Sequence, residues 1–216
     1  MTCVGLGNDV VDLRDAGVPR ARFLHRVLSV EERAWVEETR SPARTWRLWA
    51  AKETAYKALV RGKPDLVFAH SQFVVDSQGG WVRHGNDTVC VRWAETNNMV
   101  SCVGWTASAR GTVHACSRTV SEAMEIRIPL RERELAAGSD ARSRAVRLLA
   151  KLTLAEVLGV PAEGLDILRR PGTRRMGPPE VWLKGEPRSD VLISLSHDGN
   201  VVGCALMVQS DRMSGL

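Results

Sequence analysis

The sequence predicts an α+β fold made of two similar halves, each an antiparallel sheet packed on one long helix. Apolar residues at three- and four-residue spacing predict the two helices, over residues 47–62 and 145–159. Runs of β-branched and aromatic residues, separated by turn residues, follow each helix. The order of elements therefore repeats, and we expect two domains, residues 1–115 and 116–216, related by a pseudo-two-fold axis.

The first half begins with an apolar strand, residues 4–13, which contains two glycines and the carboxylate of Asp9. A helix is expected over residues 24–35, where Ser29 and Glu32 have the spacing of a capping box. The long helix comes next. The β-rich runs that follow it cover residues 66–75, 81–84, 88–93 and 99–107.

The second half replays this order. Its long helix aligns with the first at an offset of 100 residues, which places Arg147 opposite Arg47. Residues 110–121 are expected to connect the halves. The strands expected in this half cover residues 124–130, 165–168, 180–183, 191–195 and 200–208.

The differences between the two copies indicate a shared site. The first helix carries Lys52, Glu53 and Lys57, whereas the aligned positions of the second helix are uncharged. Conversely, Ser196 and His197 precede the last turn of the second half and have no counterpart in the first. Such complementary loss would be a coincidence in two pure scaffolds. We therefore expect one composite site to which each half contributes.

The composition restricts the class of protein. The 216 residues are 44% hydrophobic and contain no run long enough to cross a bilayer, and the first residues lack the pattern of a signal peptide. Five scattered cysteines without CxxC pairing are expected to be free thiols, so we expect a cytoplasmic protein with no membrane partner. A net charge of +5 favours an anionic partner: a nucleic acid, a phosphorylated small molecule or an acidic protein.

Two carboxylates suit a magnesium ion. Asp9 ends a strand and Glu53 lies within the long helix; carboxylates from separate elements, completed by water and phosphate oxygens, are typical of Mg²⁺ sites. Lys57 and Lys52 place cations about one turn away, where they would face phosphate charge. The alternative is a stabilising Glu53–Lys57 pair on a solvated helix face, with Asp9 as a turn residue.

Two basic or polar stretches in the second half favour phosphate binding. Ser196 and His197 follow an apolar strand, and the alternative is a simple hairpin turn at the next two residues, Asp-Gly. The strand geometry argues against a serine-hydrolase arrangement, because neighbouring residues on a strand point to opposite faces. Residues 169–179 contain four arginines, which favours either bidentate phosphate contacts or a solvated loop that faces nucleic acid.

Four segments together resemble the 4′-phosphopantetheinyl transferase superfamily, which includes the holo-acyl-carrier-protein synthases and the Sfp-like enzymes. GNDVVDLR from Gly7 resembles its GxDIVxxxR form, and RFLHRVLSVEE from Arg22 resembles its RFLxRVxxxxE segment. WAAKETAYK from Trp49 matches its (W/F)xxKExxxK signature, and LISLSH from Leu192 resembles its SxSHS strand. The segments cover both halves of the chain.

The resemblance implies an activity and a role for each matching residue. The activity is transfer of 4′-phosphopantetheine from coenzyme A to a serine of an apo acyl or peptidyl carrier protein, with Mg²⁺ bound and 3′,5′-ADP released. It implies that Asp9 and Glu53 bind the metal, with Glu53 also a candidate base. Lys57 would stabilise the departing 3′,5′-ADP, and Ser196 and His197 would hold nucleotide phosphate.

Some positions depart from the family pattern. Asn8 replaces the usual aliphatic residue before the aspartate, and Pro178 stands where a Gly-Lys-Pro lysine is common, so Arg174 or Arg175 is expected to replace that lysine in binding coenzyme A. The half with the acids comes first, the reverse of Sfp-like chains. Because one chain would hold both halves of the site, we expect a monomer.

Two other hypotheses remain. One is a non-catalytic relative that binds carrier proteins, which the departures at Asn8 and Pro178 favour. The other is a nucleic-acid-binding protein, which the basic charge favours; aromatic residues make up only 5% of the chain and no recognition motif is present, so we expect no nucleic-acid partner.

Overall fold

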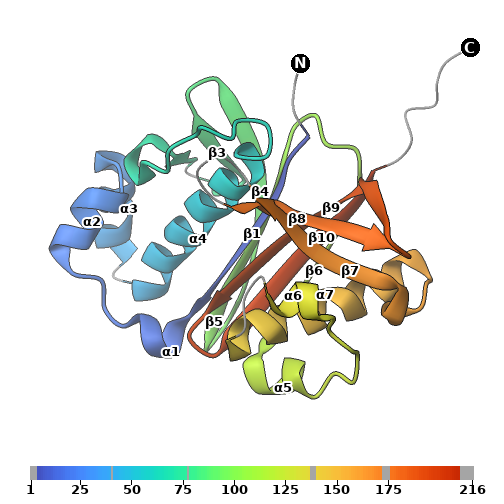
Figure 1. The fold of residues 1–216 in the computed structure, drawn as a ribbon. Coiled ribbons are helices and arrows are strands. Elements are labelled where there is room, and N and C mark those ends of the chain that lie inside the picture. Colours follow the sequence, from blue (N-terminus) through green and yellow to red (C-terminus); the bar gives the residue numbers. More distant parts are fainter. Residues whose placement is uncertain (1–3, 40, 77, 137–139, 172–175, 210–216) are drawn as a thin grey trace, which may run out of the picture. The chain divides into compact units, whose positions relative to one another are not determined.

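The computed structural model describes residues 4–39, 41–76, 78–136, 140–171 and 176–209. The chain forms two compact units, Met1–Ser108 and Ala109–Leu216, referred to below as unit 1 and unit 2. Each unit contains one five-stranded antiparallel sheet and one long helix, which confirms the α+β class (Figure 1). No helix in these described ranges combines the length and apolar character needed to cross a bilayer.

Unit 1 has a sheet with the strand order β1-β5-β4-β3-β2. The strands are β1 (Leu6–Asp12), β2 (Val74–Val75), β3 (Trp81–His84), β4 (Asp87–Thr96) and β5 (Met99–Thr106). The helices are α1 (Leu13–Ala16), α2 (Ala21–Val27), α3 (Val30–Thr39), α4 (Pro42–Leu59) and the 3₁₀ turn η1 (His70–Gln72). The helix predicted over residues 24–35 is thus two helices, and the Ser29–Glu32 capping box begins the second: Glu32 N donates to Ser29 Oγ at 3.2 Å and Ser29 N to Glu32 Oε2 at 2.8 Å.

Helix α4 lies directly on β1 and β5, as Figure 1 shows. The close contact depends on glycine. A Cβ at Gly7 would collide with the carbonyl oxygen of Thr54, and one at Gly104 would collide with its methyl group. Alanines of α4, including Ala51 and Ala55, are fully buried in the same core, where small side chains allow the helix and the sheet to approach. Strand β1 is therefore held against the middle of α4.

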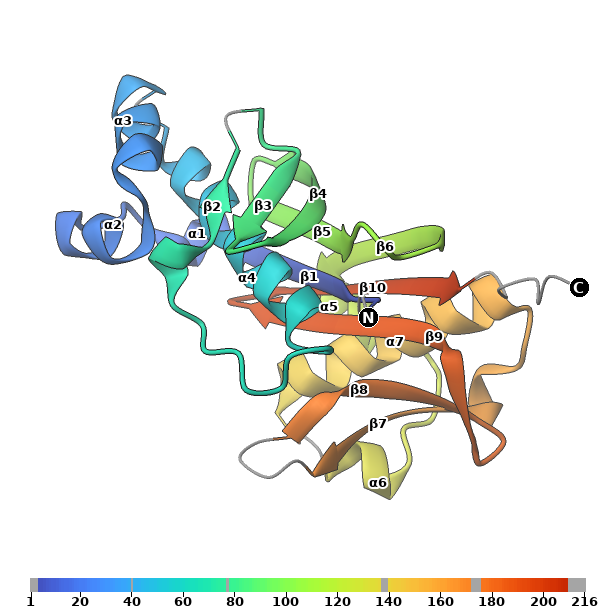
Figure 2. The same cartoon turned by 90° about the horizontal axis from the view of Figure 1, so that it is seen from above.

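Unit 2 repeats this arrangement with the strand order β6-β10-β9-β8-β7. The strands are β6 (Gly111–Thr119), β7 (Leu165–Pro171), β8 (Met176–Leu183), β9 (Glu186–Asp198) and β10 (Val201–Gln209). The helices are α5 (Val120–Met124), α6 (Glu132–Leu135), α7 (Ala141–Leu158) and the 3₁₀ turn η2 (Ala162–Gly164). Figure 2 shows α7 running alongside β9 and β10, onto which its apolar face packs.

Three segments differ from the sequence prediction. The expected connector at residues 110–121 is mostly strand β6, whose nine residues pair with β10 despite their polar character. The expected strand at residues 124–130 is the end of α5 followed by residues without regular secondary structure. Within residues 66–75, only Val74–Val75 pairs as a strand. A segment forms a strand only where a neighbouring strand pairs with it, and the β-propensity of the segment does not encode that pairing.

Matching contacts in the two units confirm the repeat, but the two long helices align at an offset of 99 residues rather than 100. Thr54 Oγ1 donates to Cys102 O in unit 1, and Thr153 Oγ1 contacts Cys204 Sγ in unit 2. Lys52 and Lys151 also make matching contacts, described below. The position of Glu53 therefore corresponds to Leu152, not to Thr153.

Candidate functional site

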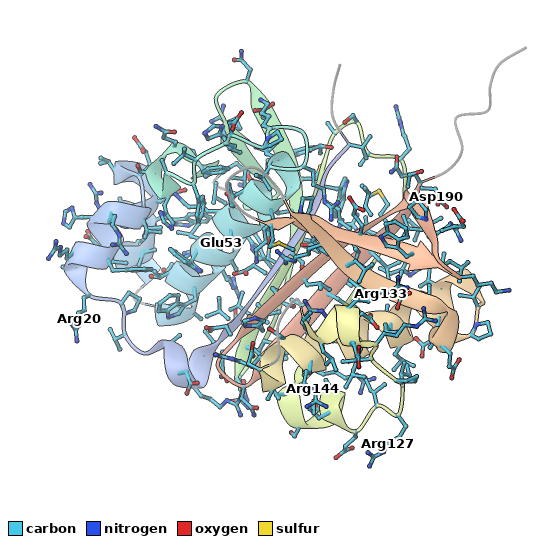
Figure 3. All side chains as sticks on the ribbon, viewed as in Figure 1. Arg20, Glu53, Arg127, Arg133, Arg144 and Asp190 are labelled. Carbon is cyan, nitrogen blue, oxygen red and sulfur yellow. The ribbon has the colours of Figure 1, made fainter. Side chains whose placement is uncertain are left out.

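The three charged residues predicted for the acid site meet in unit 1. Successive side chains of strand β1 point to opposite faces of the sheet, so Gly7, Asp9 and Val11 share the face that lies under α4. Glu53 and Lys57 are one turn apart on α4, so both lie on the same side of the helix. Figure 3 labels Glu53 on α4. The fold thus brings one carboxylate from the strand to a carboxylate and an ammonium from the helix.

Lys57 is bonded to β1. Its Nζ donates to Asp9 Oδ1 at 2.7 Å and to the carbonyl oxygen of Asn8 at 3.1 Å. The Asp9 side chain is only 11% exposed and that of Lys57 is 28% exposed, so this ion pair is shielded but reachable from solvent. The Lys57 side chain therefore crosses from helix to strand, and does not form the surface pair with Glu53 that i, i+4 spacing would also allow.

Glu53 lies in an environment that disfavours its charge. Burial raises its pKa to about 7; the negative charge of Asp9 acts in the same direction, and Lys57 opposes both. The carboxyl group makes no hydrogen bond to another residue in the described parts of the chain. Two acids thus share one lysine, and neutralising the second requires either a proton or another cation.

This donor set fits a divalent cation. Two carboxylates that repel each other at a half-buried position are the ligands that a hard ion such as Mg²⁺ prefers, with water or substrate oxygens completing its shell. Among the described residues no group of three or more histidine, cysteine or acidic side chains could hold a metal. Asp9 and Glu53 could supply two protein ligands to such an ion.

Lys52, predicted to bind coenzyme A, lies elsewhere. Its side chain is fully buried, and its Nζ donates to Glu32 Oε2 at 2.6 Å, to Val27 O at 2.9 Å and to His70 O at 3.2 Å. Every proton of its ammonium thus has an acceptor inside unit 1. Although Lys52 precedes Glu53 in sequence, it points around the helix into the core, so the structure assigns it to the scaffold and not to a phosphate.

The predicted Ser196–His197 pair separates on strand β9 of unit 2. Ser196 is buried, and its Oγ donates to Gly203 O at 3.4 Å. His197 is exposed and lies opposite Val202, a residue of the core under α7. Adjacent strand residues point to opposite faces, so only His197 shares the face of the long helix.

Asp140 caps the start of α7 near this histidine. Its Oδ2 accepts a hydrogen bond from Ser143 Oγ at 2.7 Å, and its Oδ1 accepts from the backbone N–H groups of Arg142 and Ser143. The Ser143 hydroxyl lowers the pKa of Asp140 to about 2, and the charge of His197 contributes a smaller effect of the same sign. The imidazole of His197 therefore lies within electrostatic range of the first turn of α7.

Two arginines near this helix end were not predicted individually. Arg147 on α7 is buried, and its Nη1 donates to Ser143 O at 2.8 Å. Burial lowers the pKa of Arg169 on β7, and the positive charge of Arg147 lowers it further, so the two guanidinium groups lie within electrostatic range of each other. Glu134 and Asp140 partly offset the cost of burying Arg147.

Arg147 on α7 and the two sheet residues Arg169 and His197, which lie on the sheet face that α7 covers, are referred to below as the basic cluster. The sequence signal for it was present in the arginine-rich stretch of residues 169–179, but Arg147 appeared only as the start of an apolar helix. Arg174 and Arg175, predicted to bind coenzyme A, lie outside the described residues.

Comparison of the chain with curated proteins gives no match. Residues 5–96, which include most of unit 1, match the family model described as the 4'-phosphopantetheinyl transferase superfamily. The matched segment contains Asp9, Glu53 and Lys57, the three residues that β1 and α4 bring together. Over residues 5–96 the chain is therefore similar to the 4′-phosphopantetheinyl transferase superfamily, and this match confirms the resemblance that the sequence motifs predicted.

Proposed function

We propose that the chain transfers the 4′-phosphopantetheine group of coenzyme A to a serine hydroxyl of an apo acyl or peptidyl carrier protein and releases 3′,5′-ADP. The observation that carries the proposal is the arrangement of Asp9, Glu53 and Lys57 within the segment that matches the superfamily. Two acids and one lysine suit the handling of a pyrophosphate, whose charge must be neutralised during transfer.

Asp9 and Glu53 would hold Mg²⁺. When bound, the ion would neutralise charge on the pyrophosphate of coenzyme A and help to orient it. Glu53, with a pKa of about 7 in the metal-free protein, is poised at neutral pH to be either a ligand or an acceptor of the proton from the serine hydroxyl. Its position next to Asp9 supports the first role, and its partial burial supports the second.

Lys57 would stabilise the leaving group. Its ammonium is fixed by Asp9 and by a backbone carbonyl of β1, so its orientation is set before any substrate binds. A preoriented cation stabilises the charge that develops on the departing phosphate without reorganising, which is the most effective use of a single lysine.

In unit 2, the basic cluster of Arg147, Arg169 and His197 would bind the phosphates of the nucleotide. Neighbouring guanidinium groups with lowered pKa favour a dianionic ligand, which would relieve their mutual repulsion. Ser196 would fix the strand end beside His197, and Arg174 and Arg175 would add to the same contacts. A basic chain also suits an acidic carrier protein, and one chain, acting as a cytoplasmic monomer, would supply both groups of residues.

The test is mass spectrometry of a panel of apo carrier proteins incubated with the chain, coenzyme A and Mg²⁺. The proposal expects each substrate carrier to gain the mass of phosphopantetheine with wild type and with the control Glu156→Ala, which removes an exposed carboxylate from α7. It expects no gain with Glu53→Ala or with excess EDTA. If coenzyme A binds but no carrier gains mass, the chain is instead a non-catalytic relative that binds carrier proteins.

A further inference from the structure

Unit 1 contains a fully buried ion pair with a complete set of hydrogen bonds. Lys52 Nζ donates to Glu32 Oε2 and to two backbone carbonyls, those of Val27 and His70. Glu32 accepts at both oxygens: Oε2 from Ser29 N at 2.8 Å, and Oε1 from Val75 N at 2.9 Å. The pair connects α4 to the ends of α2 and α3, to η1 and to β2. We refer to such a Lys–Glu pair and its backbone partners as a latch.

Unit 2 contains a second latch with the same wiring. Lys151 Nζ donates to Glu134 Oε2 at 3.0 Å and to Pro129 O at 2.9 Å. Glu134 Oε2 accepts from Arg131 N at 3.0 Å, and its Oε1 accepts from Ile167 N at 3.1 Å. In each unit the glutamate begins a helix through a capping arrangement, takes a backbone N–H from an edge strand of the sheet, and pairs with a lysine of the long helix.

The latches are shared although the acid site is not. Counting from the two latch lysines, the places of Glu53 and Lys57 in unit 1 are taken by Leu152 and Glu156 in unit 2. The place of Asp9, opposite Cys102 on the neighbouring strand, is taken by Cys116, opposite Cys204. A pair that is kept where the acids and the lysine are missing serves the helix itself and not a bound ligand.

The latch resists rotation of the helix. The two charged groups are 2.6 Å apart and both side chains are almost fully buried, so each ion tolerates burial only while its partner is in place. Turning or sliding α4 would separate the pair and leave two buried charges and several backbone groups without partners. Because Glu53 follows Lys52 directly and Lys57 is five residues on, a fixed Lys52 fixes where both side chains leave the helix.

We propose that Lys52 and Lys151 are equivalent positioning residues, each setting the rotation of the long helix in its own unit. The first latch holds Glu53 and Lys57 toward Asp9. The second holds Arg147, one turn before Lys151, beside Arg169. The kinetic part of the test below rests on the proposed transferase function, whereas the stability part does not.

The stability part measures the Asp9–Lys57 interaction in three backgrounds: wild type, Lys52→Met/Glu32→Gln, and the matched control Lys151→Met/Glu134→Gln. A double-mutant cycle of Asp9→Asn and Lys57→Met gives the coupling between the two side chains. Unfolding is followed by tryptophan fluorescence, because six of the seven tryptophans lie in unit 1. The coupling is expected to disappear in the first latch variant and to persist in the control. Undiminished coupling in a folded first variant would overturn the proposal.

The kinetic part compares kcat with the KM for coenzyme A. The unit 1 variant is expected to lower kcat by about tenfold or more with KM little changed, because a displaced side chain is felt in the chemical step. The unit 2 variant is expected to raise KM with kcat little changed. If both variants change the same parameter in the same way, the latches do not position separate groups and the proposal fails.

Two controls keep these outcomes separate. Should Lys52→Met/Glu32→Gln not fold, Lys52→Met/Glu32→Leu replaces it, because apolar substitution of both partners of a buried pair often preserves stability. If the wild-type chain shows no transfer to any carrier, the proposed function fails, and the coupling measurement alone still decides the positioning role.

Discussion

Replacing Glu53 by Gln is expected to stabilise the metal-free protein while removing its activity. Burial and the charge of Asp9 raise the pKa of Glu53 from an ordinary 4.5 to about 7. The native state therefore binds this proton more tightly than the unfolded state does. The contribution of Glu53 to stability is greatest below about pH 4.5, falls as the pH rises, and has been lost once the pH exceeds about 7.

The size of the effect follows from the pKa difference. An increase from 4.5 to about 7, at about 1.36 kcal/mol for each pKa unit, corresponds to about 3 kcal/mol. Glutamine has nearly the same shape without the charge. At pH 8 the Glu53→Gln protein should therefore be more stable than wild type by up to about 3 kcal/mol, whereas near pH 5 the difference should be small.

The assay is urea unfolding in EDTA at several pH values between 5 and 8, followed by tryptophan fluorescence, with Glu156→Gln as the exposed-carboxylate control. Addition of Mg²⁺ at about 100 times its dissociation constant should raise the stability of wild type by about 2.7 kcal/mol and leave Glu53→Gln unchanged. A Glu53→Gln protein that is destabilised at pH 8, or whose advantage does not vary with pH, would refute the reasoning.

Three further substitutions test the surroundings of the two sites. Lys57→Met removes the ion pair between Lys57 and Asp9 and should lower the midpoint of urea unfolding by an amount equivalent to about 1–3 kcal/mol; an unchanged midpoint would mean that solvent replaces the lysine. Gly7→Ala places a methyl group against the carbonyl of Thr54 and should cost about 1–3 kcal/mol or more, measured by the same unfolding curves and contradicted by a wild-type midpoint. Asp140→Ala removes the cap of α7 and should cost about 1 kcal/mol at pH 7, with faster hydrogen exchange confined to the first turn of that helix.

The sequence was sufficient to predict features that depend on local pattern. Apolar residues at helical spacing predicted the α4 helix. Motif spacing singled out Asp9, Glu53 and Lys57, and the structure brings these three residues together. The two-unit α+β fold was also predicted, because the order of elements repeats in the sequence. Such features need no knowledge of which distant segments touch.

Features that depend on distant partners were missed. Lys52 is next to Glu53 in sequence, but its ammonium is bonded to Glu32 and to two backbone carbonyls that no spacing rule connects to it. The same limit applies to Arg147 on helix α7, because Arg169, whose pKa its charge affects, comes from strand β7. Strand β6 looked like a connector because its partner β10 lies at the far end of the chain.

The two latches also bear on how the chain arose. Acquiring a buried Lys–Glu pair one residue at a time passes through an intermediate with a single unpaired buried charge, which typically costs about 3–5 kcal/mol. A loss of that size would unfold many small domains. Independent origin of the same wiring in two places is therefore improbable, and inheritance from one duplicated ancestor explains both copies. In that ancestor the ion pair preceded the divergence that left acids in one descendant segment and arginines in the other.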